Sequence, residues 1–221
     1  MKRIDPKLTT YTDVPRIDAA LLEAARQLPA ATLHEAAGKI GVLPPVIRPI
    51  APSFAVCGPA LTVHSPGGDN LWLHRALECA QPGDVMVVYT SGVYDHGYWG
   101  EIMATAAQTA GLAGLVIDGC VRDAARMEDM GFPVFARGTC IRGTGKDFGA
   151  TGWINSRILL GDVSVGPGDL IVGDRDGVVA IPHARIAEVI KASQEREAQE
   201  AGLLERLRAG ESTMRVYGWD Q

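Results

Sequence analysis

The spacing of apolar residues predicts two helices at the start of the chain. Helical spacing is seen at Ile17, Leu21, Leu22, Ala25 and Leu28. Pro29 ends this run, and Thr32 is suited to be the N-cap of a short second helix that reaches Ile40. Proline-rich, irregular chain follows up to Pro52.

Short runs of β-forming residues then alternate with helical segments, which is typical of an α/β protein. We expect strands at Ala60–His64, Val85–Tyr89, Gly114–Ile117 and Val134–Phe135. Between them, we expect helices at Asn70–Ala80, Glu101–Ala110 and Ala124–Met130.

The end of the chain has a different pattern. Runs at Asp162–Val165, Leu170–Val172 and Val178–Ile181 are separated by glycine-rich turns, which predicts an antiparallel meander. A long amphipathic helix follows from about His183 to Arg208, and it could pack on its own domain or on a neighbouring subunit. The length of 221 residues fits a single domain, 1–221.

Composition excludes several classes of protein. The net charge of −5 argues against nucleic acid or anionic membrane as a partner. No apolar run approaches the roughly 20 residues of a membrane span, and no signal segment is visible, so we expect a cytoplasmic protein. The four cysteines are scattered, without a Cys-x-x-Cys pair, and are expected to be free buried thiols; any metal should therefore have oxygen ligands.

The segment Leu115–Asp123 is the strongest candidate for chemistry. An apolar strand runs into a glycine turn, and Arg122 and Asp123 follow side by side. A carboxylate can hold a hard cation, and a guanidinium can offer two parallel donors to a carboxylate or enolate. The alternative is a surface Arg-Asp pair in which Asp123 caps a helix.

A second candidate is the helix start at Gly97–Ala104. Exposed amides at such a start can hold an anion, and Gly100 allows a ligand to approach the backbone closely. Glu101 in the first turn also has a structural explanation, the helix dipole.

The loop Pro66–Asn70 is either an anion-binding nest or a simple N-cap. Gly143–Lys146 lacks the spacing of a phosphate-binding loop, and no dinucleotide-binding glycine motif is present. His64, His74 and His96 lack metal-pair spacing and are expected to be polar surface or capping residues.

Taken together, these segments resemble the RraA-like superfamily over nearly the whole chain. Within it, the chain resembles the class II pyruvate aldolases acting on 4-hydroxy-4-methyl-2-oxoglutarate and 4-carboxy-4-hydroxy-2-oxoadipate. The resemblance is carried by Thr32–Ala36, Ser65–Asn70, Gly100–Met103, Gly119–Asp123, Arg208–Glu211 and Val216–Gly218.

The resemblance implies a three-layer β/β/α swivelling domain with N-terminal helices and a long C-terminal helix. It also implies a homotrimer or a dimer of trimers, with sites between subunits. By this likeness Asp123 would bind Mg²⁺ or Mn²⁺, and Arg122 would contact the pyruvyl oxygen. Backbone amides near Gly100, Ile102, Met103 and Ala104 would hold the pyruvyl carboxylate. Water on the metal would be bound by Glu35, Glu101 and a glutamate of a neighbour's C-terminal helix, Glu200 or Glu197.

The implied reaction is retro-aldol cleavage of an oxo acid to pyruvate plus oxaloacetate or a second pyruvate. Because oxaloacetate decarboxylation gives the same enolate, a decarboxylase side activity is expected. Two alternatives remain. The superfamily also contains non-catalytic regulators of a ribonuclease, and another oxo acid could be the substrate of a decarboxylase with the same machinery. The presence of Glu35, Glu101 and Asp123 together favours chemistry.

Overall fold

Four parallel strands form the centre of the fold in the computed structural model, which describes residues 3–220. The strands are β2 (Val56–His64), β3 (Val85–Tyr89), β4 (Gly114–Asp118) and β6 (Val134–Ala136). In register, Ala60 pairs with Val85, and Val85 pairs with Gly114. Nearly all side chains of β3 and β4 are buried, as expected for parallel strands covered on both faces. The loops after β2, β3 and β4 therefore meet at one edge of the sheet.

Antiparallel strands extend this sheet on both sides. The hairpin of β11 (Leu170–Asp174) and β12 (Gly177–Ile181) joins β2 through β11. At the other edge, β1 (Arg48–Pro49) pairs with β6. β8 (Trp153–Ile154) is not at that edge; it pairs with the last two residues of β2, beyond the part of β2 that pairs with β11.

The predicted three-stranded meander is wrong in its first strand. β10 (Val163–Val165) pairs with β9 (Ile158–Leu160) in a separate two-stranded sheet. β11 pairs instead with β2, more than a hundred residues earlier in the chain. A second small sheet joins β5 (Cys120–Val121) to β7 (Gly138–Thr139).

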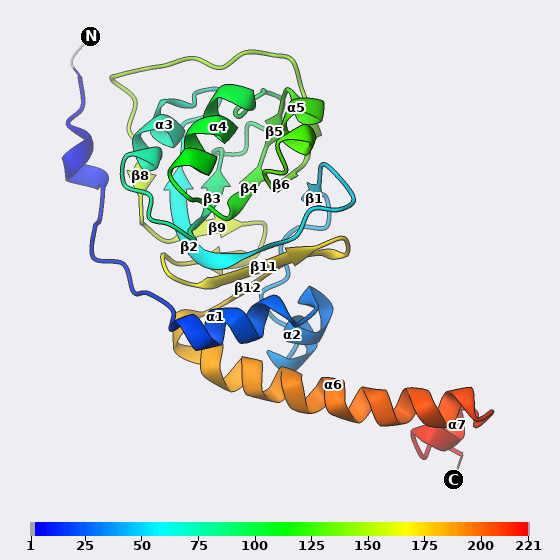
Figure 1. The fold of residues 1–221 in the computed structure, drawn as a ribbon. Helices are drawn as coiled ribbons and strands as arrows, with labels where there is room; N and C mark the ends of the chain where they lie inside the picture. The colour runs from blue at the N-terminus through cyan, green and yellow to red at the C-terminus, as the bar shows by residue number, and fades with distance from the viewer. Residues whose placement is uncertain (1–2, 221) are drawn as a thin grey trace.

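Three short helices cover the upper side of the sheet in Figure 1. They are α3 (Leu71–Leu77), α4 (Glu101–Thr109) and α5 (Ala124–Asp129). Their apolar faces close the larger hydrophobic core, in which Trp72, Met103 and Met127 are buried.

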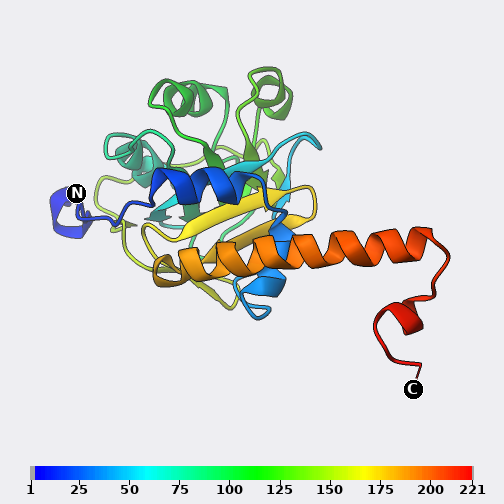
Figure 2. The same cartoon turned by 60° about the horizontal axis from the view of Figure 1, so that its bottom comes forward.

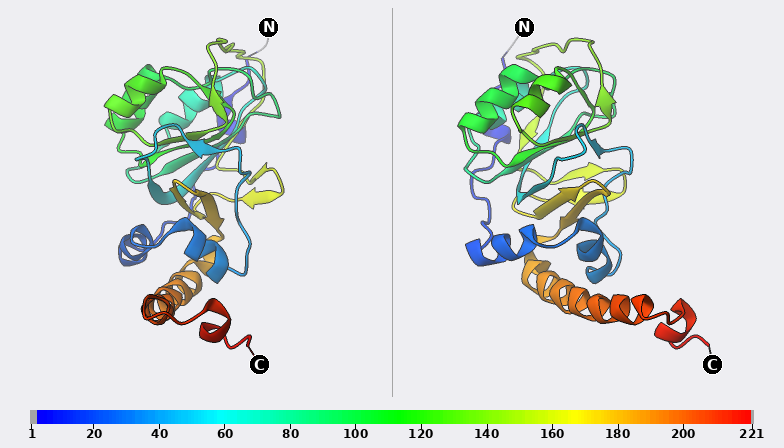
Figure 3. Two further views of the ribbon diagram at one scale, coloured as in Figure 1. Left: turned by 90° about the vertical axis from the view of Figure 1, so that its right-hand side faces the viewer. Right: turned by 45° about the vertical axis from the view of Figure 1, so that its right-hand side comes forward.

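The remaining long elements lie below β11 and β12 (Figures 1 and 3). They are α1 (Ala19–Arg26), α2 (Ala30–Ala36) and α6 (Ile186–Arg208), with the short helices η2 (His183–Arg185) and α7 (Thr213–Val216). The short N-terminal helix η1 (Pro6–Thr9) lies instead beside β8. Ile186, Val189 and Ile190 of α6 are buried in a second core with Leu33 of α2. The outer half of α6 extends beyond the body of the chain (Figure 2).

Thr32 is not the N-cap that the sequence predicts. α2 begins at Ala30, directly after Pro29, and the Ala30 amide donates to Asp174 Oδ2 over 2.9 Å. Thr32 thus lies inside the helix, where its hydroxyl donates to Glu197 of α6. The first amide of α2 is therefore bound by the carboxylate of Asp174, which is distant in sequence, and not by a local capping side chain.

Two further expectations can be compared with the structure. All four cysteines are free, as predicted, but they are half-buried rather than buried. Within residues 3–220, no helix has both the length and the hydropathy to cross a bilayer.

Candidate active site

The loops that follow β3 and β4 are joined by backbone hydrogen bonds. The Tyr98 amide donates to Cys120 O over 3.1 Å, and the Arg122 amide donates to Trp99 O over 2.8 Å. A Cβ atom at Gly97 would lie 2.5 Å from Cys140 O, so only glycine permits this approach. The result is a fixed placement of Arg122 and Asp123 beside the start of α4.

Asp123 is held at the amino end of α4 rather than capping its own helix. Its backbone is left-handed, with φ of 56°, and its carboxylate makes no capping hydrogen bond to α5. Instead, Asp123 Oδ2 accepts a hydrogen bond from the Glu101 amide over 3.2 Å. A Cβ atom at Gly100 would lie 2.4 Å from the same oxygen, so the contact depends on glycine.

The first turn of α4 offers two unpaired amides. Ala104 donates to Gly100 O over 3.0 Å and Glu101 donates to Asp123, which leaves Ile102 and Met103 without a backbone acceptor. Ile102 and Met103 line a pocket, whereas Ala104 does not. Of the amides expected to bind the substrate carboxylate, those of Ile102 and Met103 are therefore available, whereas the Ala104 amide already donates to Gly100 O.

This pocket has a volume of about 250 Å³ and gathers several of the predicted site residues. Arg122 Nε lies 3.7 Å from Asp123 Oδ2, and their side chains are 49% and 41% exposed. Both groups can therefore meet a small ligand. We call it the Arg122 pocket; its lining is Asn70, His74, Gly97, Tyr98, Trp99, Gly100, Ile102, Met103, Arg122, Asp123, Gly143, Thr144 and Lys146.

Asp123 is the one carboxylate in the lining of the Arg122 pocket. Residues 3–220 contain no cluster of three or more side chains suited to holding a metal ion. Mg²⁺ and Mn²⁺ often take one or two protein carboxylates and complete their coordination with water and substrate oxygens. A single carboxylate beside an anion seat fits that type of site, so the residues present are compatible with such an ion.

The other predicted glutamates lie elsewhere. Glu101 follows Gly100 directly, with its side chain exposed. Glu35 is on α2, below β11 and β12, and its carboxylate lies 3.8 Å from Lys39 Nζ. Glu197 and Glu200 are on α6, which packs against α2. Within one chain, Glu35, Glu197 and Glu200 are therefore separated from Arg122 and Asp123 by the sheet.

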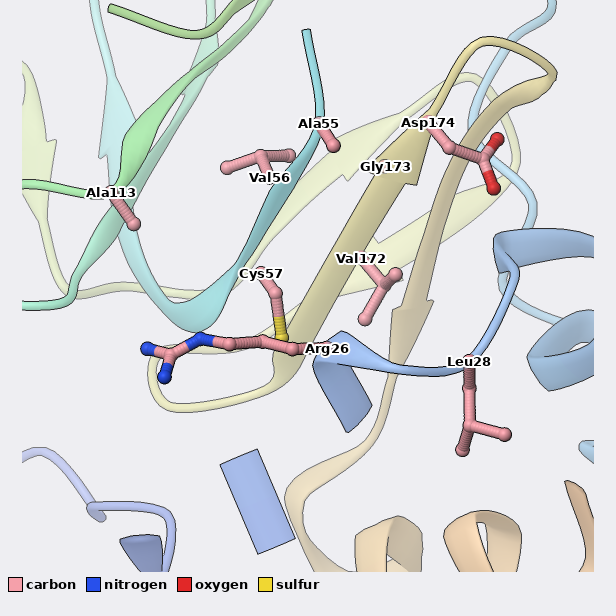
Figure 4. Close-up of a pocket in the computed structure, with 9 residues that line it drawn as sticks. All are labelled: Arg26, Leu28, Ala55, Val56, Cys57, Ala113, Val172, Gly173 and Asp174. Atoms are coloured by element: carbon pink, nitrogen blue, oxygen red, sulfur yellow. The ribbon is translucent and has the colours of Figure 1, made fainter. Parts of the chain in front are cut away.

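A different pocket, of about 320 Å³, lies between α1, β2 and β11 (Figure 4). Its lining is mostly apolar, and Cys57 points toward the backbone of Arg26. Burial raises the pKa of the Cys57 thiol to about 11, only partly opposed by the charge of Arg26. A thiol with this pKa is protonated at neutral pH, so the pocket lacks an activated nucleophile.

Cys57 is accordingly expected to resist alkylation. Its raised pKa leaves only about one thiol in a thousand ionised at pH 8, so iodoacetamide should modify Cys57 far more slowly in the folded protein than in urea. Peptide mapping by mass spectrometry gives the modified fraction at each cysteine. The rate at Cys57 should rise about tenfold per pH unit above pH 8. Rapid, pH-independent labelling would contradict the buried thiol.

Sequence reasoning missed two polar side chains of the Arg122 pocket, His74 and Lys146, and left the role of a third, Asn70, open between an anion nest and an N-cap. His74 is neither a capping residue nor remote, and Lys146 comes from the segment discarded as a phosphate-binding loop. Asn70 lies at the N-cap position of α3 but makes no capping bond; its Nδ2 donates to Tyr98 O over 2.8 Å. Burial and the neighbouring Lys146 charge lower the pKa of His74, with Asp69 opposing them.

Comparison with known proteins identifies the class to which this fold and site belong. Residues 18–180 match the family model described as RraA-like, Aldolase/RraA. The chain therefore belongs to the RraA-like family. The match ends before α6 begins.

Two of the similar proteins cover most of the chain; one carries an aldolase name, and the other is uncharacterized. The chain is 37% identical over 175 residues to a "Putative 4-hydroxy-4-methyl-2-oxoglutarate aldolase" of Halalkalibacterium halodurans, covering 79% of this chain and 82% of that protein. It is 34% identical over 157 residues to an uncharacterized protein of Methanocaldococcus jannaschii, covering 71% and 74% of the two chains.

Solved structures agree in fold. An uncharacterized protein from Pseudomonas syringae has a TM-score of 0.82 at 26% identity, covering 93% of this chain and 96% of that one. RraAS2 of Streptomyces coelicolor, described as an unusual member of the RNase ES inhibitor RraA family, has a TM-score of 0.73 at 27% identity, covering 85% and 96%. The predicted RraA-like α/β fold is confirmed.

Proposed function

We propose that this protein is a divalent-metal-dependent pyruvate aldolase that cleaves 4-hydroxy-2-oxo acids. The supporting observation is that one small pocket is lined by Arg122, by Asp123 and by Ile102 and Met103, whose amides have no acceptor among the described residues. A cation, a guanidinium and a carboxylate seat are the groups that a pyruvate enolate needs around it. The aldolase name of the Halalkalibacterium halodurans relative points the same way. The proposed substrates are 4-hydroxy-4-methyl-2-oxoglutarate and 4-carboxy-4-hydroxy-2-oxoadipate.

The chain's own residues have distinct tasks in this proposal. The amides of Ile102 and Met103 bind the pyruvyl carboxylate at the positive end of α4. Arg122 donates hydrogen bonds to the 2-oxo oxygen, where negative charge grows as the C3–C4 bond breaks. Because Arg122 is always charged, it stabilises the enolate without gaining or losing a proton.

Asp123 is the residue that would hold Mg²⁺ or Mn²⁺. When bound, the divalent cation supplies Lewis-acid stabilisation of the enolate oxygen. Glu101, whose backbone amide donates to the Asp123 carboxylate, would accept hydrogen bonds from water near the site through its side chain. Since decarboxylation of oxaloacetate gives the same enolate, it is the expected side activity.

The site would be completed in a homo-oligomer, as a trimer or a dimer of trimers. α2 with Glu35 and α6 with Glu200 lie below β11 and β12, whereas α4 and α5, between which Arg122 and Asp123 stand in the sequence, lie on the opposite side (Figure 1). The carboxylate of Glu197 accepts a hydrogen bond from Thr32 of its own chain, whereas Glu200 is 41% exposed and pairs only with Arg196 on the same helix. Glu200 is therefore the better candidate to reach a neighbour's site.

The decisive experiment measures pyruvate release from 4-carboxy-4-hydroxy-2-oxoadipate, with Mg²⁺ or with EDTA, for wild type and Asp123→Asn. Asparagine tolerates the left-handed backbone at this position but lacks the charge that holds the cation. We expect metal-dependent turnover in wild type and a loss on the order of 1,000-fold in the variant.

A folded wild-type protein without turnover in any condition would refute the proposal. The ribonuclease-regulator reading, which rests on the likeness to the Streptomyces coelicolor protein, would then be tested by inhibition of RNA cleavage. Turnover that EDTA does not reduce would support the lyase activity but contradict its dependence on a metal ion.

A further inference from the structure

We infer that Lys146 is the specificity-determining residue that binds a second carboxylate of the substrate in the Arg122 pocket. The inference rests on the proposed function, since it divides the substrate into a pyruvyl half and a distal half. It selects oxo acids that carry a carboxylate on C4 over those that carry only alkyl groups there.

The backbone around Lys146 is fixed against the loop that precedes α3. Gly145 donates to Gly68 O over 2.7 Å, and the Asp147 amide donates to Asp69 Oδ2 over 2.5 Å. Asp69 itself is buried, with its other carboxylate oxygen accepting from the Leu71 amide. Lys146 therefore extends from an anchored segment.

The side chain of Lys146 is also directed by a buried group. Its Nζ donates to Asn70 Oδ1 over 2.9 Å, while Asn70 Nδ2 donates to Tyr98 O. Asn70 is 6% exposed and lines the same pocket as Met103. This pair of bonds leaves the two remaining protons of the ammonium available for a ligand.

The charge of Lys146 has no acidic partner in the described part of the chain. No carboxylate oxygen lies within the 4.0 Å that defines an ion pair, although Lys39 and Lys191 each have such a partner on the surface. Asp147, the next residue in the sequence, accepts from the Gly149 amide through Oδ1, and both carboxylate oxygens of Asp69 accept from backbone amides. An unneutralised ammonium at a pocket wall is a suitable site for an anion.

The charges of the whole pocket match a substrate with more than one carboxylate. Its lining holds two cations, Arg122 and Lys146, against one carboxylate, Asp123. His74 lies beside Lys146, and burial together with that ammonium lowers its pKa. His74 is thus a neutral hydrogen-bonding neighbour rather than a third cation.

A matched pair of substrates isolates the role of Lys146. Cleavage of 4-hydroxy-4-methyl-2-oxoglutarate gives two molecules of pyruvate. Cleavage of 4-hydroxy-4-methyl-2-oxopentanoate gives pyruvate and acetone, because a methyl group replaces the C5 carboxylate. In both reactions the C3–C4 bond breaks and the C4 hydroxyl loses its proton, so only the distal group differs.

Lys146→Met should lower the preference for the dicarboxylate, measured as kcat/KM for 4-hydroxy-4-methyl-2-oxoglutarate divided by kcat/KM for 4-hydroxy-4-methyl-2-oxopentanoate, at least about tenfold. The change should come mainly from a higher KM for the dicarboxylate. Lys146→Arg, which keeps the charge, should retain most of the preference. Lys7→Met removes an exposed lysine that does not line the Arg122 pocket and serves as the charge-matched control. Exchange of the pyruvate methyl protons in D₂O, followed by NMR, monitors the pyruvyl half independently.

If the Lys146→Met variant still exchanged pyruvate protons but lost kcat/KM equally for both substrates, or for neither, the role of Lys146 in selectivity would be wrong. A wild-type protein that neither exchanges pyruvate protons nor releases pyruvate would instead end the proposed function, and this inference with it. The two failures are therefore distinguishable.

Discussion

Replacement of Arg122 by lysine is expected to lower kcat for pyruvate release by about 100- to 1,000-fold, because a point charge does not reproduce the two parallel donors of the guanidinium. Arg122 is half-exposed, and its backbone placement comes from the amide bond to Trp99 O rather than from the side chain. The fold should therefore tolerate the substitution. A coupled assay of pyruvate release measures the effect.

The matched control is Arg126→Lys. Arg126 is exposed on α5, one helical turn after Arg122, and does not line the Arg122 pocket. Its replacement should leave kcat unchanged, and both variants should melt at the wild-type temperature. If Arg122→Lys raised KM alone, Arg122 would contribute binding rather than stabilisation of the enolate, and our assignment would be wrong.

Mixing two inactive variants should restore activity, provided that each site is shared between subunits. Arg122→Ala damages the pocket side of the chain, and Glu200→Gln damages the α6 side, where a loss of at least about tenfold is expected. In a closed ring of equal, randomly mixed chains, about a quarter of the interfaces combine two intact sides. Co-expressed, randomly mixed chains would therefore recover about a quarter of wild-type activity.

The control for this experiment mixes Arg122→Ala with Asp123→Asn. Both substitutions damage the pocket side of the chain, so every chain in the mixture, and therefore every interface, has a damaged pocket. That mixture should stay inactive. Recovery there, or none in the Arg122→Ala and Glu200→Gln mixture, would reject a shared site.

Local sequence signals predict the elements of this fold well but not their partners. The runs at β3 and α4 are recognisable because apolar period and turn residues act within a few positions. The pairing of β11 with β2 is set by packing between distant segments, so the glycine turn before Leu170 gives no indication of it. The start of α2 fails for the same reason, since its cap is Asp174, 144 residues away.

The residues of the candidate site likewise include some that the sequence predicts and some that it does not. The Gly-Cys-Val-Arg-Asp segment and the helix start at Gly100 are contiguous motifs, and the structure brings them together at one pocket. Lys146 and His74 carry no motif. Lys146 reaches the pocket because Gly145 and Asp147 bind the loop at Gly68 and Asp69, contacts that no spacing rule predicts. The one hint in the sequence is a lysine within a glycine-rich loop that matches no phosphate-binding pattern.

The geometry of α6 restricts the kinds of mutation that this part of the chain can accept during evolution. The buried residues Ile186, Val189 and Ile190 hold the first turns of the helix to its own chain, while the outer half stands clear of the body. Each residue of an α-helix adds about 1.5 Å of length and about 100° of rotation. Inserting one residue between Ser193 and Glu200 would therefore turn Glu200 to a different side, although no core contact changed. The outer half of α6 thus behaves as a rigid spacer with a fixed phase, so substitutions along it should be accepted far more readily than insertions or deletions.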